Sequence, residues 1–348
     1  MKFGQLALAV AMLLSGCGTR ADVASIGSQD LAPSVSYRVT GTVSVGDRVG
    51  GLAVDSSTGT LYASTSDGIS VIDASTRTVV ADIPVGFDSQ DVAVDPVTHT
   101  VYVLNARDNS VSVIDGVARA LTATVPVGKN PSGIAVDPVA HRVYVTHQGD
   151  QELSVIDGAT RSVIDTLQVV PTQAGMRNHL SGVAVDPETD RVYVSSWRSP
   201  EDELPYSSEH LVTVIDGSTR TVTATVVAGR GQNGLAVDSR SHVVYVVNGW
   251  DKAIAVIDGS TNVVTATVPV DVAPYLAEPL AVDSGTNTLY VIPYRANSVN
   301  VIDAAKRAVV ATVPVGEPLT GLVVDSVTHR VYVTQRDGPM SIIESVPG

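Results

Sequence analysis

Cysteine, aromatic side chains and basic charge are all scarce in this chain. Cys17 is the single cysteine among 348 residues, which excludes an intramolecular disulfide framework, a cysteine-rich zinc site and a Cys-x-x-Cys redox pair. Aromatic residues make up 4%, with two tryptophans and two phenylalanines, so the core must be built mainly from Val, Ile, Leu and Ala. The 22 basic residues against 36 acidic ones give a net charge of −14, which argues against a nucleic-acid partner.

Long apolar runs are also missing, apart from a short one near the N-terminus. Leu6–Leu14 is too short to span a bilayer and is typical of a signal-peptide core. The sequence Leu14-Ser15-Gly16-Cys17 follows it and resembles the lipobox of bacterial lipoproteins. The resemblance implies that Cys17 is lipidated, with residues 1–16 a signal peptide and residues 17–36 a flexible tether. We therefore expect an extracytoplasmic protein of the cell envelope, anchored to the membrane through Cys17; a plain secretory signal is the alternative.

The rest of the chain is a sevenfold repeat. A hydrophobic segment ending in aspartate recurs along it: Asp55, Asp95, Asp137, Asp186, Asp238, Asp283 and Asp325. Seven residues after each aspartate stands a tyrosine: Tyr62, Tyr102, Tyr144, Tyr193, Tyr245, Tyr290 and Tyr332. Each repeat holds short runs rich in Val, Ile, Thr and Tyr, and no segment shows a helical apolar period. Four such runs in about 40–45 residues are typical of one β-propeller blade.

The order of strands within a blade follows from residue size and from proline. The first run of each repeat has small residues, as in Gly133-Ile-Ala-Val136, which suits the crowded centre of a propeller. The fourth run carries proline, as at Pro126, which belongs on an edge strand because it lacks an N–H donor. The seventh repeat lacks a fourth run, and Val39–Gly46 matches that pattern. We predict an all-β, seven-bladed propeller over residues 37–348, with antiparallel blades and closure by the N-terminal strand.

Two segments carry a family resemblance. Tyr144-Val-Thr-His147 and Tyr332-Val-Thr-Gln335, together with the repeated Val-Ile-Asp and Pro-Val-Gly segments, resemble the YVTN-type β-propeller repeat family. The resemblance covers residues 37–348 and implies a seven-bladed propeller similar to surface-layer and cell-envelope proteins. It implies little about function, because the repeat residues are structural.

Most of the acidic charge falls in the recurrent turns of the repeat. Aspartate there accepts hydrogen bonds from backbone N–H groups just downstream, as in an Asx-turn. Four histidines occupy the same turns in different repeats, too far apart to share one metal ion: His99, His141, His242 and His329. We interpret these histidines as solvated turn residues.

Insertions break the repeat on one face of the predicted ring only. The spacing from aspartate to tyrosine is the same in every repeat, whereas the segments containing Trp197 to His210, Gln173 to His179, and Glu278 are lengthened. Both tryptophans lie on this face, with Tyr206, Tyr275 and Tyr294. Binding sites are commonly formed by variable loops that carry aromatic residues on a rigid scaffold. The alternative is that these aromatic side chains only pack the inserted loops.

The predicted binding site combines this insertion face with the mouth of the central channel. Its polar ring with several arginines suits carboxylate or sugar groups. The candidate ligand-binding residues are Arg48, Gln90, Asn130, His179, Trp197, Arg198, Asn233, Trp250, Glu278, Tyr294, Arg295 and Arg336, with Asn105 and His147 in neighbouring loops. We predict a monomeric, non-catalytic binding or scaffold protein. Its partner is a cell-envelope protein or a small polar or anionic ligand, and it contacts the membrane through the lipid anchor alone.

An enzyme is the alternative interpretation. Some propellers place lactonase or lyase sites at the channel mouth, where His179, Glu278, Asn130 and Asn233 could hold a divalent cation, although their spacing is not diagnostic. The GxSxG, HExxH and CxxCH motifs are absent from the sequence. No catalytic residue and no cofactor are therefore predicted, and a role beside a redox cofactor is disfavoured because nothing here resembles a haem ligand set.

Overall fold

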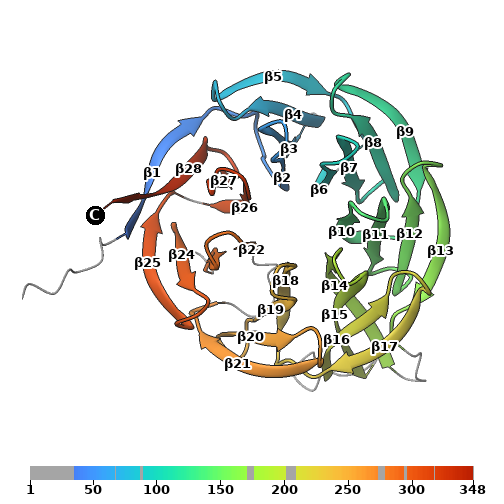
Figure 1. Cartoon of the computed structure of the whole chain (residues 1–348). Coiled ribbons are helices and arrows are strands. Elements are labelled where there is room, and N and C mark those ends of the chain that lie inside the picture. The colour runs from blue at the N-terminus through green and yellow to red at the C-terminus, as the bar shows by residue number, and fades with distance from the viewer. Residues whose placement is uncertain are drawn as a thin grey trace, which may run out of the picture.

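Seven four-stranded antiparallel sheets stand around a central axis in the computed structural model (Figure 1). The structure describes residues 35–347 except 67, 87–88, 171–175, 201–208, 273–278, 294–295 and 317, and only the backbone of 176–177, 199–200, 209 and 233. The described part contains strands β1 to β28 and no helix, and accordingly no helix in it is long and apolar enough to cross a bilayer. The predicted all-β seven-bladed propeller is confirmed.

Each blade runs from an inner strand to an outer one. Blades 1 and 2 consist of β2 (Leu52–Asp55), β3 (Thr60–Thr65), β4 (Gly68–Asp73), β5 (Thr78–Ile83), and β6 (Ser89–Asp95), β7 (Thr100–Asn105), β8 (Ser110–Asp115), β9 (Ala120–Pro126). Blades 3 and 4 consist of β10 (Pro131–Asp137), β11 (Arg142–His147), β12 (Glu152–Asp157), β13 (Ser162–Gln168), and β14 (Met176–Asp186), β15 (Arg191–Pro200), β16 (Glu209–Asp216), β17 (Thr221–Val226).

The remaining blades complete the ring. Blades 5 and 6 consist of β18 (Gln232–Asp238), β19 (Val243–Asn248), β20 (Ala253–Asp258), β21 (Val263–Pro269), and β22 (Leu280–Asp283), β23 (Thr288–Val291), β24 (Ser298–Asp303), β25 (Ala308–Pro314). Blade 7 consists of β26 (Leu319–Val324), β27 (Val331–Gln335), β28 (Met340–Pro347) and β1 (Val35–Val43). The predicted closure is confirmed, because β1 pairs with β28 from Val35 to Val43 (Figure 1). Closure leaves β28 without a free edge.

The core lies between neighbouring blades and comes mainly from the two middle strands. The repeat tyrosine of one blade packs into the hydrophobic cluster of the next, as Tyr102 does with Val143 and Val145. Outer strands alternate between exposed and half-buried residues, as in β13, because only one of their faces meets a neighbour. The proline of the fourth run ends the outer strand rather than lying in its middle, as at Pro126, where no further ladder bond is needed from its nitrogen.

The two turns of each blade form one face, which we call the turn face. The predicted Asx-turns are present there, as where Asp137 Oδ1 accepts the N–H groups of Val139 and Ala140 at 2.8 and 3.0 Å. The interpretation of the turn histidines as merely solvated is wrong. Each donates from Nδ1 to the buried aspartate carboxylate of the preceding blade, at 2.7 to 2.9 Å: His99 to Asp55, His141 to Asp95, His242 to Asp186 and His329 to Asp283. These pairs join consecutive blades, because a buried carboxylate needs a hydrogen-bonding partner.

Candidate functional site

The opposite face, which we call the insertion face, holds the loops between second and third strands and the connections from blade to blade. Blade 4 is extended on this side, since β14, β15 and β16 have 11, 10 and 8 residues where the matching strands of blade 3 have 7, 6 and 6. The sequence predicts loops for these insertions. The parts of the blade 4 insertions that the structure describes, residues 176–179, 197–200 and 209–210, instead continue the ladder, with His179 opposite Trp197 and Trp197 opposite His210.

Four side chains form an aromatic row where blades 4 and 5 meet. The rings of His179 and Trp197 stack with centroids 3.8 Å apart and an angle of 11°. His210 and Trp250, from the loop between β19 and β20, meet edge to face at 5.4 Å and 68°. Directly opposite residues of antiparallel strands share one face of a sheet. His179, Trp197 and His210 therefore project together, and the contact with Trp250 brings blade 5 to them.

The aromatic row faces blade 5 rather than blade 3. Alternate residues of a strand share a face, so Trp197 lies on the side of Tyr193 and His210 on the side of Val212. Tyr193 and Val212 pack with Val244 of blade 5. We call this place the blade 4–5 junction. Sequence reasoning put His179, Trp197 and Trp250 on one face, and the structure brings them within one cluster.

Buried polar groups without partners lie beside the row. Gln232 is 1% exposed, and neither Nε2 nor Oε1 has a hydrogen-bond partner among the described residues. Asn248, which pairs with Gln232 across the sheet, donates from Nδ2 to the carbonyl of Ala228 at 2.7 Å, but its Oδ1 has no described partner. An unsatisfied buried amide costs on the order of 1–3 kcal/mol and calls for an explanation.

His210 presents a third unmatched group at the same junction. Its Nδ1 accepts the backbone N–H of Gly231 at 3.3 Å, so in the neutral ring the proton is on Nε2. Nε2 is buried and has no partner among the described residues. Burial lowers the pKa of His210 and keeps the ring neutral. The junction therefore offers a donor from His210 and both a donor and an acceptor from Gln232.

Arg198 lies on the other side of blade 4. It stands opposite Asn178, one residue out of phase with the aromatic row, so its side chain faces blade 3. The backbone N–H of Asn178 donates to Oε1 of Gln151 of blade 3 at 3.1 Å, and Asn178 Oδ1 has no partner among the described groups. Arg198 and Trp197 are thus neighbours in the chain on opposite faces of the blade.

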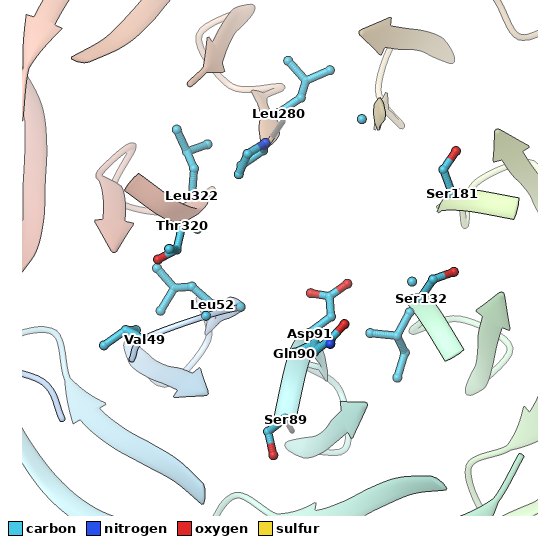
Figure 2. A pocket seen from close by; sticks show the side chains of 18 of the residues that line it. Val49, Leu52, Ser89, Gln90, Asp91, Ser132, Ser181, Leu280, Thr320 and Leu322 are labelled. Carbon is cyan, nitrogen blue, oxygen red and sulfur yellow. The ribbon is translucent and has the colours of Figure 1, made fainter. Parts of the chain in front are cut away.

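The central channel is a separate cavity of about 1080 Å³, lined by the inner strands and the nearby loops (Figure 2). Of the predicted residues, Arg48, Gln90 and Arg336 line it, with Asp337, at its insertion-face end. Asn130, His179, Trp197, Arg198 and Trp250 are not part of its described lining. The predicted single site is therefore two sites: the channel mouth and the blade 4–5 junction.

Asp91 is the channel residue that sequence reasoning missed. Figure 2 shows its carboxylate pointing from β6 into the open centre of the channel. The equivalent position, four residues before the repeat aspartate, is glycine in five repeats and Pro279 in the other: Gly51, Gly133, Gly182, Gly234 and Gly321. Aligning the inner strands would have revealed an acid where the blade normally has no side chain.

The environment of Asp91 is partly desolvated. Burial raises the pKa of Asp91 to about 6, although the backbone N–H groups of Val92 and Ile134 donate to it and act in the opposite direction. The bond from the Val92 nitrogen to Oδ1 is 2.9 Å. No ion-pair partner of Asp91 occurs among the described residues.

Several other predicted residues have local roles or lie outside the description. Asn130 donates from Nδ2 to Gln148 Oε1 at 3.3 Å within its own blade. Asn105 and His147 were expected in the polar ring but are fully buried. Asn105 bonds Ser110 and Ser112, and His147 bonds Ser154, so both hold the start of the third strand. Outside the described residues or side chains lie Cys17, Asn233, Tyr206, Tyr275, Glu278, Tyr294 and Arg295.

The predicted metal ligands are only partly described. His179 stacks on Trp197 at the blade 4–5 junction, and the Asn130 amide is engaged in blade 3, so these two do not meet at the channel. Within the part of the chain that the structure describes, no group of three or more His, Cys, Asp or Glu residues is placed to hold a metal ion. The divalent cation at the channel mouth stays a prediction.

Fold and site together define the class of protein: a seven-bladed β-propeller with one plain face and one elaborated face. Among solved structures, the chain is similar to hydrazine synthase of Kuenenia stuttgartiensis, with a TM-score of 0.69 and 17% identity over 88% of this chain and 97% of that chain. At that identity the likeness shows the fold alone. No family model and no curated protein matches the sequence, so the resemblance to the YVTN-type family is not confirmed.

Proposed function

We propose that this chain is a non-catalytic binding protein of the cell envelope, anchored through lipidated Cys17, that holds its partner on the insertion face at the blade 4–5 junction. The aromatic row of His179, Trp197, His210 and Trp250 carries the proposal. His179, Trp197 and Trp250 are half-buried, and His210 is buried. Half-buried aromatic side chains supply binding energy at low entropic cost, and tryptophan is enriched among residues that dominate interfaces.

The unmatched polar groups support the same place. Gln232 and His210 hold donors and an acceptor that have no partner among the described residues. A partner that offers a carboxylate, hydroxyl or amide group would satisfy them. This fits an envelope protein or a small polar or anionic ligand, as the sequence indicated, and the acidic charge of −14 disfavours nucleic acid.

A quantitative pull-down from native envelope tests the proposal. The baits are the wild type, a Trp197→Ala/Trp250→Ala double variant, and Val117→Ala as a control on the turn face, where Val117 is 73% exposed. We expect one partner to bind the wild type and the control equally and to lose at least tenfold with the double variant. Equal capture by all three baits would overturn the proposal.

Tryptophan fluorescence tests whether a small ligand binds at the blade 4–5 junction. The chain has two tryptophans, and both belong to the aromatic row. Titration with galacturonate, an anionic sugar, is expected to change their emission if the junction accepts such a group. Turnover of a lactone that requires a divalent cation would instead support the enzyme alternative.

A further inference from the structure

We propose that the central channel binds a small organic cation, whose ammonium group forms an ion pair with Asp91. This site is distinct from the blade 4–5 junction, and the inference does not rest on the proposed function. Asp91 belongs to β6 of blade 2, whereas the aromatic row belongs to blades 4 and 5.

The fold does not need a carboxylate at this position. Five of the seven blades have glycine there, and they form the same inner strand. Asp91 therefore departs from the repeat at a position where the ring closes without it. Besides accepting the backbone N–H groups of Val92 and Ile134, it puts one charged group into the channel. A charge held in a partly desolvated place is costly unless a counter-ion reaches it.

The surroundings of Asp91 leave room for that counter-ion. The neighbouring inner strands present Gly51 and Leu52 on one side and Gly133 and Ile134 on the other, so no charged side chain of these strands faces it. The other charged groups of the described lining are Arg48, Arg336 and Asp337 at the mouth. The cavity of about 1080 Å³ is large enough for a small molecule.

An organic cation fits this lining better than a bare metal ion. The hydroxyl groups of Ser132 and Ser181 are already bonded to Thr146 and Ser195 at 3.1 and 3.0 Å. One carboxylate is a weak ligand set for Ca²⁺ or Mg²⁺, which take several oxygen ligands. An ammonium group needs a single carboxylate, and the leucines and glycines of the wall suit its carbon chain. The net charge of −14 favours the entry of cations into the channel.

Acid should weaken this binding. Burial raises the pKa of Asp91 to about 6, so the side chain is ionised at pH 7.5 and mostly neutral at pH 5. Because the cation needs the ionised form, its affinity should fall about tenfold between these two pH values.

Saturation-transfer NMR with butylammonium as the probe tests the inference, with butanol and butyrate as neutral and anionic probes of the same length. Three variants accompany the wild type. Asp91→Asn removes the charge, Asp91→Gly restores the residue of five other blades and should fold, and Asp82→Asn removes one exposed charge from the outer strand β5 as a control.

We expect the wild type and Asp82→Asn to bind butylammonium in preference to butanol and butyrate. Both Asp91 variants should bind it at least tenfold more weakly, and wild-type affinity should drop at pH 5. Equal binding to wild type and Asp91→Gly would overturn the inference. So would preference for butyrate, which would assign the channel to the mouth arginines, or the absence of any cation binding.

Discussion

Replacing Gln232 by leucine should make the protein more stable, although it removes a hydrogen-bonding side chain. Gln232 is 1% exposed and its amide has no partner among the described residues. The matching position is apolar in five of the other six blades, for example Val49, Leu180 and Leu319, and is Ser89 in blade 2. A leucine at position 232 would thus restore the packing of the repeat and remove a buried unsatisfied group.

The expected change in Tm follows from the free-energy cost of the unsatisfied amide of Gln232. Relief of an unsatisfied buried amide is worth on the order of 1–3 kcal/mol. For a domain of this length the entropy of unfolding makes 1 kcal/mol correspond to about 1.5 °C in Tm. Gln232→Leu should therefore raise Tm by about 2–5 °C, measured by calorimetry, while weakening partner binding at the blade 4–5 junction.

A matched control exists in blade 7. Gln335 is also buried, but its Nε2 donates to the carbonyl of Pro339 at 3.0 Å. Gln335→Leu should lower Tm, because it leaves that carbonyl without its partner. If Gln232→Leu lowers Tm as Gln335→Leu does, the amide of Gln232 is satisfied in the protein and our argument for an unfilled site is refuted.

Three further predictions concern the ring itself. A hydrogen bond from the backbone N–H of Thr219 is the main cause that lowers the pKa of Asp216 to about 2. Because this pKa is below the unfolded value, ionised Asp216 stabilises the fold above about pH 4, and this stabilisation is lost toward pH 2. Urea midpoints should therefore fall over that range in the wild type and fall less in Asp216→Asn. His99→Ala should cost about 1–3 kcal/mol in urea unfolding, since Asp55 loses a hydrogen bond at 2.8 Å; an unchanged midpoint would contradict the role of the pair. Deleting residues 35–43 should expose β28 and cause aggregation in size-exclusion chromatography, and a monomeric deletion variant with an unaltered Tm would disprove closure by β1.

The ring could be predicted because every blade repeats the same sequence pattern. Seven copies of the aspartate-to-tyrosine spacing, with proline on the fourth run, determine strand order and closure. The turn aspartates were also predictable, because an Asx-turn is local in the chain. The pairing of His99 with Asp55 was not, since it joins residues 44 apart in different blades.

The site was predictable only in part, because insertions have no repeat to be compared with. Their position indicated the correct face, but the pairing of His179 with Trp197 depends on strand register within the insertion. That same register separates Arg198 from Trp197. Asp91 lies inside the repeat, where the equivalent position is glycine in five other blades, so a comparison of the inner strands with one another could have identified it.

Site-specific photo-crosslinking in the native envelope tests the central claim most directly. One probe replaces Val227, which is 75% exposed on the insertion face between β17 and β18, and a matched probe replaces Val117, 73% exposed on the turn face. We predict a single partner adduct from position 227 that disappears when Trp250→Ala is added, and none from position 117. An adduct from position 117 alone would show that the turn face, and not the insertion face, meets the partner.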